Sequence, residues 1–476
     1  MSDQIKTNNA IVKRSEDFSS WYTSIISAAK LALYTDIKGG IIFQPRVWKL
    51  WSLIQKEIDQ RFVHLGVCNV ALPTFIRYSE FMKEKEHVDG FAPEVFLITH
   101  KGKDKLDEPL VVRPTSEVIF CDYFRKITTS YNDLPIKYNQ WCNVFRAEKT
   151  TRPFLRTTEF FWQELHAIFD KETEAISFTK QILDVYYDFA TNVLNIPVIK
   201  GEKTPGERFA GAENTYTIEA LMQDGQALQC GTSHYLGTNF AKTYDIKFTN
   251  SANQNEYVYQ MSAGVSTRII GAIIMSHSDD NGLVLPFKIA PEQINIIELM
   301  ADKDPNVHLN ALKIQKTLNK YRVNIDNSSK SFGYKISEAE VSGIPFSIII
   351  GSKDLANKQV TIYRRDLKTK AIYQLDGISE TIEKLINEYN ANLFKRAQDN
   401  LRKRTITIST LDEFKNAINE AKLIIAPWGG DIDDEKKLKE LTGATPRCIK
   451  ENITDNVKCF FTNKKAKYLV YFARAY

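Results

Sequence analysis

Features of membrane-spanning and exported proteins are missing from this sequence. Nowhere in its 476 residues is there a run of about 18 apolar residues, the length that a helix needs to cross a bilayer. The first ten residues, MSDQIKTNNA, contain neither the apolar core of an export signal nor an arginine-rich amphipathic stretch. We therefore expect a cytoplasmic protein with no membrane partner.

Cysteine is scarce, and its spacing argues against a disulfide scaffold. The cysteines form no CxxC pair and no dense framework, so reduced thiols in a cytosolic compartment are expected. Their six positions are Cys68, Cys121, Cys142, Cys230, Cys448 and Cys459.

The rest of the composition is that of an ordinary globular protein. Apolar residues make up 43% of the chain and charged residues 25%. A chain of 476 residues is long enough for about three domains. The net charge of +5 permits an RNA partner without requiring one.

The most informative stretch is residues 141–169, WCNVFRAEKTTRPFLRTTEFFWQELHAIF. It has the pattern of two strands rich in aromatic residues, joined by a polar loop that carries or adjoins Arg146, Arg152 and Arg156. Arginine keeps its charge and offers a rigid fork of donors, which suits the oxygens of a polyphosphate. The stretch therefore favours a nucleotide site, with a solvated surface hairpin as the alternative.

The second strand of this stretch has the pattern of a pocket floor. Phe160, Trp162, Glu164 and His166 occupy alternate positions. Alternate side chains of a strand point to the same face, so aromatic and ionisable groups share one surface.

FRAE followed by PFLRTTEFFWQELH resembles the second signature motif of class II aminoacyl-tRNA synthetases, in the form found in prolyl-tRNA synthetases. The resemblance implies ATP with Mg²⁺, L-proline and tRNA(Pro) as ligands, and it gives Arg146 the α-phosphate and the substrate carboxylate. The other ATP-binding positions that it implies here are Glu148, Arg156 and Thr157. The proline-binding positions are Arg146, Trp162, Glu164 and His166.

Residues 109–120, PLVVRPTSEVIF, pass from a strand into a Thr-Ser-Glu turn. A hydroxyl and a carboxylate two residues apart can together accept both N–H bonds of a secondary ammonium. Thr115 and Glu117 resemble the TxE loop of the family, which implies proline binding. A helix N-cap, with Thr115 or Ser116 capping and Glu117 in the first turn, is the alternative, and both can hold together.

Residues 227–240, ALQCGTSHYLGTNF, resemble the GTSHxLGxNF signature of the same family. The resemblance implies that Gln229 and Thr232 face ATP and its magnesium, and that His234 faces the proline. A purely structural histidine beside a glycine turn is the alternative.

In residues 258–275, a glycine-containing strand leads to Arg268 and an apolar helix. Arg268 resembles the arginine of the third class II motif, which implies contact with the γ-phosphate, and a helix N-terminus attracts anions. Ser266 would join the ATP site, and Ser262 and Gly264 the proline site, where small residues let the substrate approach the backbone. The family commonly has tryptophan where Ala263 stands, which leaves the shape of the pocket open.

A helix over residues 46–64, a strand over 68–72 and Pro73 resemble the first class II motif, which forms a dimer interface in that family. We therefore expect a homodimer, although any α/β protein can contain this order of elements. About a hundred residues separate the second and third motifs, which is too few for another domain of ordinary size. This matches the eukaryote- and archaea-like type, which lacks an editing domain at that position.

We expect an α/β (α+β) fold with three domains. Residues 1–286 would form the class II catalytic domain, a mostly antiparallel sheet flanked by helices. Residues 287–395, where strands and helices alternate, would form a small α/β anticodon-binding domain, and 396–476 a small α/β C-terminal domain. In the second domain, Ser347 and Ile349 stand where the family often has arginine and glutamate, so those anticodon contacts do not carry over.

The C-terminal domain of relatives often binds zinc through four cysteines, and a closed zinc site needs all four ligands. The aligned positions here are Gly429, Asp434, Cys459 and Phe461, so one ligand is left and we expect no zinc. The aromatic C-terminus resembles the family's closing sequence, whose terminal tyrosine packs toward the catalytic domain.

The expected activity is ATP-dependent formation of prolyl-adenylate, followed by transfer of proline to tRNA(Pro). Because proline offers no side-chain hydrogen bond, its selection must rest on pocket filling, and we expect measurable activation of alanine. A synthetase for threonine or glycine should differ in the RPTSE and TSH segments. A non-enzymatic accessory protein should have lost Arg146 and Arg268, and both are present.

Overall fold

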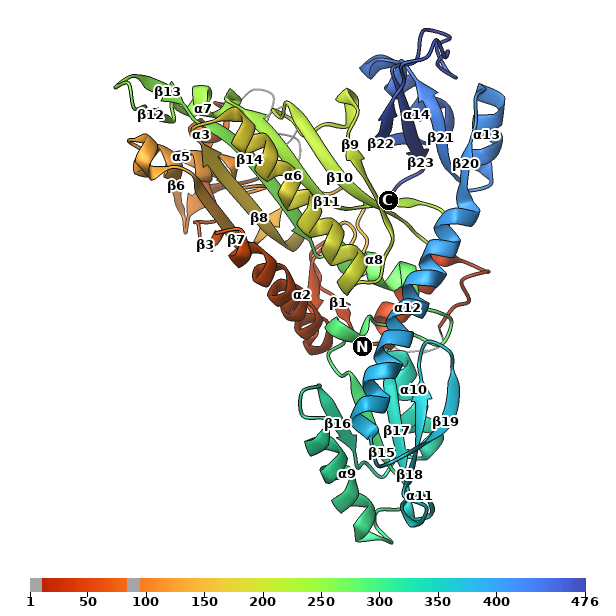
Figure 1. Ribbon diagram of the computed structural model, residues 1–476. Helices are drawn as coiled ribbons and strands as arrows, with labels where there is room; N and C mark the ends of the chain where they lie inside the picture. Colours follow the sequence, from red (N-terminus) through yellow and green to blue (C-terminus); the bar gives the residue numbers. More distant parts are fainter. Residues whose placement is uncertain (1–10, 84–94) are drawn as a thin grey trace.

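The computed structural model describes residues 11–83 and 95–476 (Figure 1). The first ten residues, on which the expectation of no targeting segment rests, lie outside the described residues. Within the described part of the chain, no helix is both long and apolar enough to cross a membrane.

A large sheet organises the catalytic domain, with its strands in the order β3-β7-β8-β14-β11-β10-β9. From β7 to β9 every neighbouring pair is antiparallel, and only β3 pairs in parallel with β7. This confirms the mostly antiparallel catalytic sheet. The strands are β3 (Cys68–Asn69), β7 (Ile136–Phe145), β8 (Glu159–Phe169), β9 (Val198–Glu202), β10 (Asn214–Leu221), β11 (Ala227–Gly237) and β14 (Tyr259–Ser266).

Helix α6 covers one face of this sheet, whereas α5 covers only part of the other face, where its Phe120 stacks on His166, and the rest is free for a site. Helix α6 packs across β11 and β14, and the hydroxyl of its Tyr186 donates to Gln163 on β8 at 2.7 Å. Residues 162, 164 and 166 alternate with Gln163, so they point to the opposite face. The main helices are α1 (Phe18–Ala28), α2 (Pro45–His64), α5 (Glu117–Ile127), α6 (Glu172–Asp188) and α8 (Arg268–His277).

Smaller elements complete the catalytic domain. They are β1 (Ala32–Tyr34) with β2 (Ile41–Phe43); β4 (Phe75–Arg77), α3 (Tyr78–Phe81), β5 (Phe96–Lys101) and β6 (Asp104–Val112); and α7 (Asn239–Tyr244), β12 (Lys247–Thr249) and β13 (Asn255–Tyr257). Between β8 and β14 the chain forms only α6, β9 to β13, α7 and short turns. This interval therefore holds no additional domain, as its length predicted.

The first helix is shorter than the apolar spacing in residues 15–33 suggests. Its N-cap is Asp17, whose carboxylate accepts the N–H groups of Ser19 and Ser20. It ends at Ala28, just before Lys30, which has a φ of 51°. A left-handed residue cannot continue a right-handed helix, so the chain turns there into β1.

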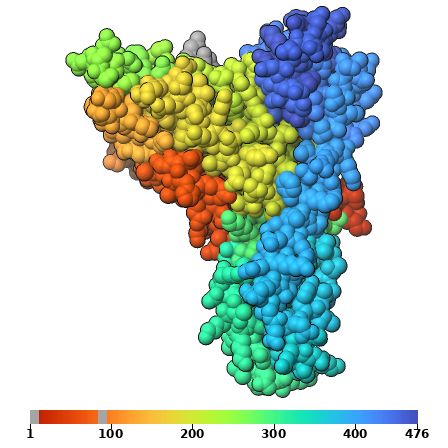
Figure 2. Space-filling model, viewed as in Figure 1, coloured from red at the N-terminus to blue at the C-terminus, as the bar shows by residue number. Residues whose placement is uncertain are grey.

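The second domain is a five-stranded sheet in the order β16-β15-β17-β18-β19, parallel across its first three strands and antiparallel across the rest. Figure 2 shows it as a separate lobe at the lower end of the molecule. Its elements are β15 (Ile294–Glu298), α9 (Pro305–Thr317), β16 (Val323–Asp326), α10 (Phe332–Ser342), β17 (Phe346–Ile350), α11 (Ser352–Ala356), β18 (Gln359–Arg364) and β19 (Thr369–Gln374).

Helix α12 (Ile378–Arg404) links this lobe to the C-terminal domain (Figure 1). It passes through the boundary expected at residues 395/396, because the stretch contains no glycine or proline to stop it. The C-terminal elements are β20 (Thr405–Thr407), α13 (Leu411–Asn419), β21 (Leu423–Trp428), α14 (Ile432–Thr442), β22 (Thr445–Asn452) and β23 (Tyr468–Ala473).

The C-terminal domain extends the catalytic sheet. Strand β22 pairs with β9 through Ile449 and Glu202, and β23, β21 and β20 follow outward. One sheet of eleven strands therefore runs through both domains.

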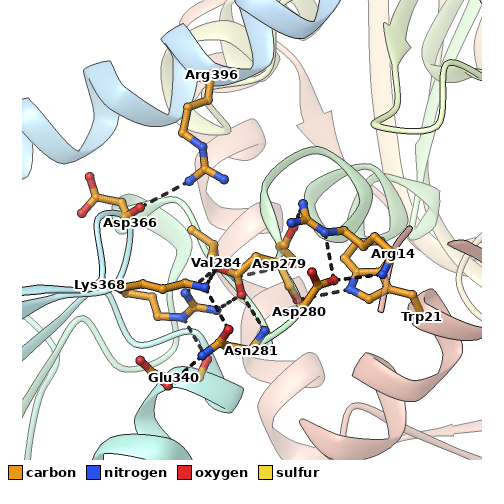
Figure 3. Close-up of polar contacts among 12 residues, drawn as sticks. Arg14, Trp21, Asp279, Asp280, Asn281, Val284, Glu340, Asp366, Lys368 and Arg396 are labelled. Carbon is orange, nitrogen blue, oxygen red and sulfur yellow. Dashed lines mark hydrogen bonds and ion pairs between the residues drawn. The ribbon is translucent and has the colours of Figure 1, made fainter. Parts of the chain in front are cut away.

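Polar contacts at the end of α8 join the catalytic domain to the lower lobe (Figure 3). The carboxylate of Asp279 accepts hydrogen bonds of 2.9 and 2.6 Å from Arg365, lies 3.1 Å from Lys368, and its carbonyl accepts from Trp21 of α1. Burial would raise the pKa of Asp279, but the hydrogen bonds and charge of Arg365 hold it well below its ordinary value. The carboxylate is thus charged and fixes the lobe against α8.

Candidate active site

The free face of the catalytic sheet contains a cavity of about 230 Å³. Its walls come from β8, β11, β14 and the loops before α5 and β10. The following residues proposed from the sequence line it: Thr115, Glu117, Arg146, Trp162, Glu164, His166, Gln229, Thr232, His234, Ser262, Gly264, Ser266 and Arg268.

Strand register explains why residues far apart in the sequence meet here. His166 lies opposite Ser262, which lies opposite His234, so the three form a row across β8, β14 and β11. Residues two positions along each strand point to the same face. The neighbouring row on that face consists of Glu164, Gly264 and Thr232.

Glu164 is a buried carboxylate that accepts hydrogen bonds from several groups of the protein. It accepts from the N–H of Ser116 at 2.9 Å, from the Ser116 hydroxyl at 2.8 Å and from the Cys142 thiol at 3.2 Å. Nε2 of His166 lies 3.5 Å away. Burial would raise the pKa of Glu164, but the hydrogen bond and charge of His166 and the Ser116 hydroxyl lower it overall. The group is therefore held ionised.

Glu117 and Thr115 add a second acidic point to this end of the cavity. Both are buried, and the Thr115 hydroxyl donates to the Glu117 carboxylate. Ser116 occupies the N-cap position of α5, but its hydroxyl donates to Glu164 instead of capping the helix. Ligating atoms of Glu117, Glu164 and His166 all lie within 4.8 Å of one another. Such a cluster can receive a cationic group.

His234 forms the opposite wall of the same end. Its Nδ1 is 3.0 Å from the Thr215 hydroxyl, and its ring packs on Phe209 with centroids 4.6 Å apart. Burial, with the positive charges of His166 and Lys203, lowers the pKa of His234 to about 3. The imidazole is therefore neutral at pH 7.

The lining residues that were missed from the sequence include Glu207, Arg208 and Phe209, in the loop between β9 and β10. The loop sequence TPGERFAGAE contains a proline and two glycines among charged residues, which is a turn signal. That signal predicts a loop, but it does not show that the loop folds over β11.

The other end of the cavity is rich in arginine. Arg146 follows β7; its Nε donates to the carbonyl of Pro114 at 3.1 Å, and its guanidinium lies 5.2 and 5.6 Å from the rings of Phe160 and Trp162. These contacts hold the guanidinium against two aromatic rings.

Arg268 is the first residue of α8, and its Nε donates to the carbonyl of Leu155 at 3.2 Å. Burial, with the like charges of Arg156 and Arg146, lowers the pKa of Arg268 to about 10. It still carries its charge at pH 7, in a cluster of cations that an anion would stabilise.

Glu148, Arg156 and Thr157 are not among the residues that line the cavity. The exposed Arg156 pairs with Glu148 at 3.2 Å on the loop between β7 and β8, close enough to Arg268 to affect its charge. Thr157 is buried and its hydroxyl donates to the carbonyl of Glu159. Their role in nucleotide binding stays a prediction.

The floor of the cavity has little room for larger side chains. A Cβ atom on Gly264 would lie 3.2 Å from the carbonyl of Gln163 and 3.5 Å from the ring of Trp162. Next to it, Ala263 lines the cavity where a tryptophan was expected. The hydroxyl of Ser262 is buried without a hydrogen-bond partner among the described residues, so it is available to a ligand.

The four positions considered for zinc lie in the C-terminal domain, and packing dominates there. Phe461 stacks on Trp428 with centroids 6.1 Å apart, and Cys459 is buried. A Cβ atom on Gly429 would collide with the carbonyl of Lys465, so a cysteine would not fit there without a shift of the backbone. These residues do not make a closed zinc site.

Three domain models match the chain. They are the tRNA synthetase class II core domain (G, H, P, S and T) at residues 98–277, an anticodon binding domain at 293–387, and the C-terminal domain of prolyl-tRNA synthetase at 411–476.

The chain also matches relatives over nearly its whole length. The chain is 53% identical to the proline–tRNA ligase of Ureaplasma urealyticum over 98% of both chains. It is 52% identical to that of Malacoplasma penetrans over 98% of this chain and 99% of the relative. It is 46% identical to that of Clostridium novyi over 100% of both.

Proposed function

The chain belongs to the proline–tRNA ligase family of class II aminoacyl-tRNA synthetases, and we propose that its cavity activates L-proline with ATP before transfer to tRNA(Pro). The family decides between the alternatives that the sequence left open. Full-length identity to ligases for proline argues against a synthetase for threonine or glycine and against a non-enzymatic accessory protein.

The division of the cavity into an acidic and a basic end carries this proposal. Glu117 and Glu164 lie beside His166, whereas Arg146 and Arg268 lie close enough to each other for their charges to interact. An amino acid presents an ammonium and a carboxylate, and ATP presents a polyphosphate. The ammonium of proline would be received by Glu117 and Thr115, which leaves its carboxylate toward Arg146.

The reaction is an in-line attack of the proline carboxylate on the α-phosphate of ATP, which gives prolyl-adenylate and pyrophosphate. The carboxylate is already a nucleophile, so no protein base and no covalent enzyme intermediate are needed. Arg146 neutralises the α-phosphate and Arg268 the γ-phosphate, so positioning and charge stabilisation dominate. Gln229 and Thr232 would hold the magnesium that accompanies ATP, which would supply further neutralisation of phosphate charge, and Ser266 would contact the nucleotide.

The proline ring would lie on the floor formed by Trp162, His166 and Gly264, with His234 and Ser262 beside it. Because His234 is neutral, it adds no charge that would repel the ammonium. The ring makes no hydrogen bond, so selection depends on how well it fills this space.

The matching anticodon-binding domain supports tRNA(Pro) as the second substrate. Ser347 and Ile349, the two positions that differ from the family pattern, are 1% and 4% exposed on β17. Buried side chains cannot touch a nucleotide, so the tRNA contacts must come from other residues of this domain.

Three further features belong to the proposal. We expect a homodimer, on the likeness of α2 and β3 to the first class II motif, and sedimentation analysis tests it. We expect no stoichiometric zinc, which elemental analysis of the purified protein tests. The expected location is the cytoplasm, which fractionation tests.

Charging of tRNA(Pro) tests the proposed function as a whole. Purified protein with ATP, magnesium and labelled proline should convert tRNA(Pro) to the acid-precipitable form. A tRNA for threonine or glycine, each with its own amino acid, should stay uncharged. Charging of one of these instead of tRNA(Pro) would overturn the proposal.

A further inference from the structure

The loop between β9 and β10, residues 203–213, is called here the wall segment. It contributes Glu207, Arg208 and Phe209 to the cavity. The N–H of Phe209 donates to the Thr215 hydroxyl at 3.0 Å, the same hydroxyl that contacts His234. The position of the wall segment therefore sets the position of the ring that packs on His234.

The base of the wall segment is tied to the C-terminal domain by a buried group of three charges. Lys203 donates to one oxygen of Glu219 at 2.8 Å, and Arg447 of β22 donates to the other oxygen at 2.9 and 3.1 Å. The three side chains are 1%, 1% and 7% exposed. The backbone N–H of Lys203 also donates to the carbonyl of Thr215 at 2.8 Å, which connects this group directly to the cavity wall.

Arg447 supplies the hydrogen bonds to the second carboxylate oxygen of Glu219. Burial would raise the pKa of Glu219, but the charges of Lys203 and Arg447 lower it, so the carboxylate is ionised. Lys203 would still pair with Glu219 if Arg447 were removed, but the second carboxylate oxygen would be left buried without its donor, which is costly. Without Arg447, Glu219 and Lys203 would have to move toward water, and the wall segment would move with them.

A second contact from the same domain reaches the middle of the wall segment. Glu435 of α14 packs on Gly206, where a Cβ atom would collide with its carboxylate. Burial, with the like charges of Glu207 and Asp431, raises the pKa of Glu435 to about 7. Thr204 and the N–H of Gly206 oppose this shift. Glu207 on the wall segment and Asp431 on α14 are the charged groups that face it.

We propose that Arg447 and Glu435 of the C-terminal domain are positioning residues for proline: they hold the wall segment against His234 and so set the affinity for the amino acid. Neither residue lines the cavity, so neither is catalytic. The inference rests on the proposed function, because it takes the cavity to be the proline site. Pairing of β22 with β9 supplies the rigid support that such a role requires.

The first test is Arg447→Met, which keeps much of the length and removes the charge, in the full-length protein. In proline-dependent pyrophosphate exchange, KM for proline should rise about tenfold or more, while KM for ATP and kcat change less than about threefold. Arg447→Lys, which keeps one cation, should recover most of the affinity. Arg474→Met is the matched control, since the exposed guanidinium of Arg474 donates to Thr442 and Asn419 of the same domain; it should leave both KM values unchanged.

The second test uses a variant that preserves shape. The Glu435 carboxyl loses its proton as pH rises through about 7, which places a charge beside Glu207. KM for proline should therefore rise between pH 6 and pH 8 in the unaltered protein. In Glu435→Gln, whose side chain stays neutral, this rise should be reduced. If Arg447→Met fails to fold, KM for proline in Arg447→Lys and its pH dependence in Glu435→Gln test the positioning role.

The outcomes separate this inference from the proposed function. No proline-dependent exchange by the unaltered protein would overturn both. Normal exchange by the unaltered protein, with KM for proline unchanged in Arg447→Met or with KM for ATP raised equally, would overturn the positioning role alone. So would a KM for proline that depends on pH in the same way with and without Glu435.

Discussion

The two ends of the cavity are built on different principles. At the amino-acid end, Glu164 already accepts bonds from Ser116 and Cys142, and His166 stacks on Phe120 with centroids 4.0 Å apart. At the nucleotide end, burial, with the like charges of Arg156 and Arg146, lowers the pKa of Arg268. The first end holds its carboxylate through hydrogen bonds within the protein, whereas the second brings three arginines close enough for their charges to repel.

This difference separates binding and stability from catalysis. A change at the amino-acid end should disturb packing and affinity together, because its polar groups are buried and paired. A change at the nucleotide end should reduce the rate with little loss of stability, because its repulsion decreases when an arginine is removed.

The largest expected effect comes from Arg146→Ala. Loss of a guanidinium that neutralises the reacting phosphate should lower proline-dependent pyrophosphate exchange by about a thousandfold. The melting temperature should change little. Arg125→Ala, which removes an exposed arginine paired with Asp122 on α5, is the matched control and should retain activity within about twofold. Full exchange activity in Arg146→Ala would remove its proposed role.

At the other end, Glu164→Gln should lower stability as well as activity. The amide nitrogen would face the donors that now bond to the carboxylate, so the free energy of unfolding should fall by about 1–3 kcal/mol. A loss of the same size in the binding of proline would lower kcat/KM for proline by as much as about a hundredfold. Calorimetry and exchange kinetics measure the two effects. Glu174→Gln, at an exposed pair with Lys171, is the control. A Glu164→Gln variant that loses activity with an unchanged melting temperature would show that affinity and stability are not coupled at the amino-acid end.

A cavity that selects by shape should discriminate modestly. Alanine lacks the ring methylenes of proline, and each missing methylene costs about 1–3 kcal/mol, so kcat/KM for alanine should be detectable. Exchange driven by alanine at high concentration measures it. An undetectable alanine-dependent rate would show that the amino-acid end uses more than pocket filling.

The smallest effect concerns acid stability. His234 has a pKa of about 3 in the folded protein, well below that of an exposed histidine, so the unfolded chain binds more protons between these values. Stability therefore falls as pH falls through this window, by about 1.4 kcal/mol per pH unit for this one group. Denaturant unfolding of His234→Gln between pH 6 and pH 4 should show a slope smaller by that amount. An equal slope in both proteins would mean that His234 is charged when folded.

Much of the cavity could be predicted from local patterns. Alternation along β8 placed Trp162, Glu164 and His166 on one face, and the likeness of short motifs to the family placed Arg146, His234 and Arg268 beside them. Helices such as α2 and α8 followed from apolar spacing and from Pro45 and Arg268 at their starts.

Contacts that depend on long-range pairing could not be predicted. Nothing local in Ile449 or Glu202 shows that β22 joins β9, because strand pairing is decided by packing across the whole sheet. The wall segment has a clear turn signal, but its contacts with His234 and Arg447 arise only when three separate strands come together. Asp17 caps α1, two residues after the start of the apolar spacing in residues 15–33, a difference that sequence patterns do not resolve.

Pyrophosphate exchange into ATP, with each amino acid offered singly, tests the central claim most directly. The account predicts that proline drives exchange best, that alanine follows weakly, and that Arg146→Ala abolishes both. Exchange driven best by another amino acid, or no exchange from folded protein, would contradict it.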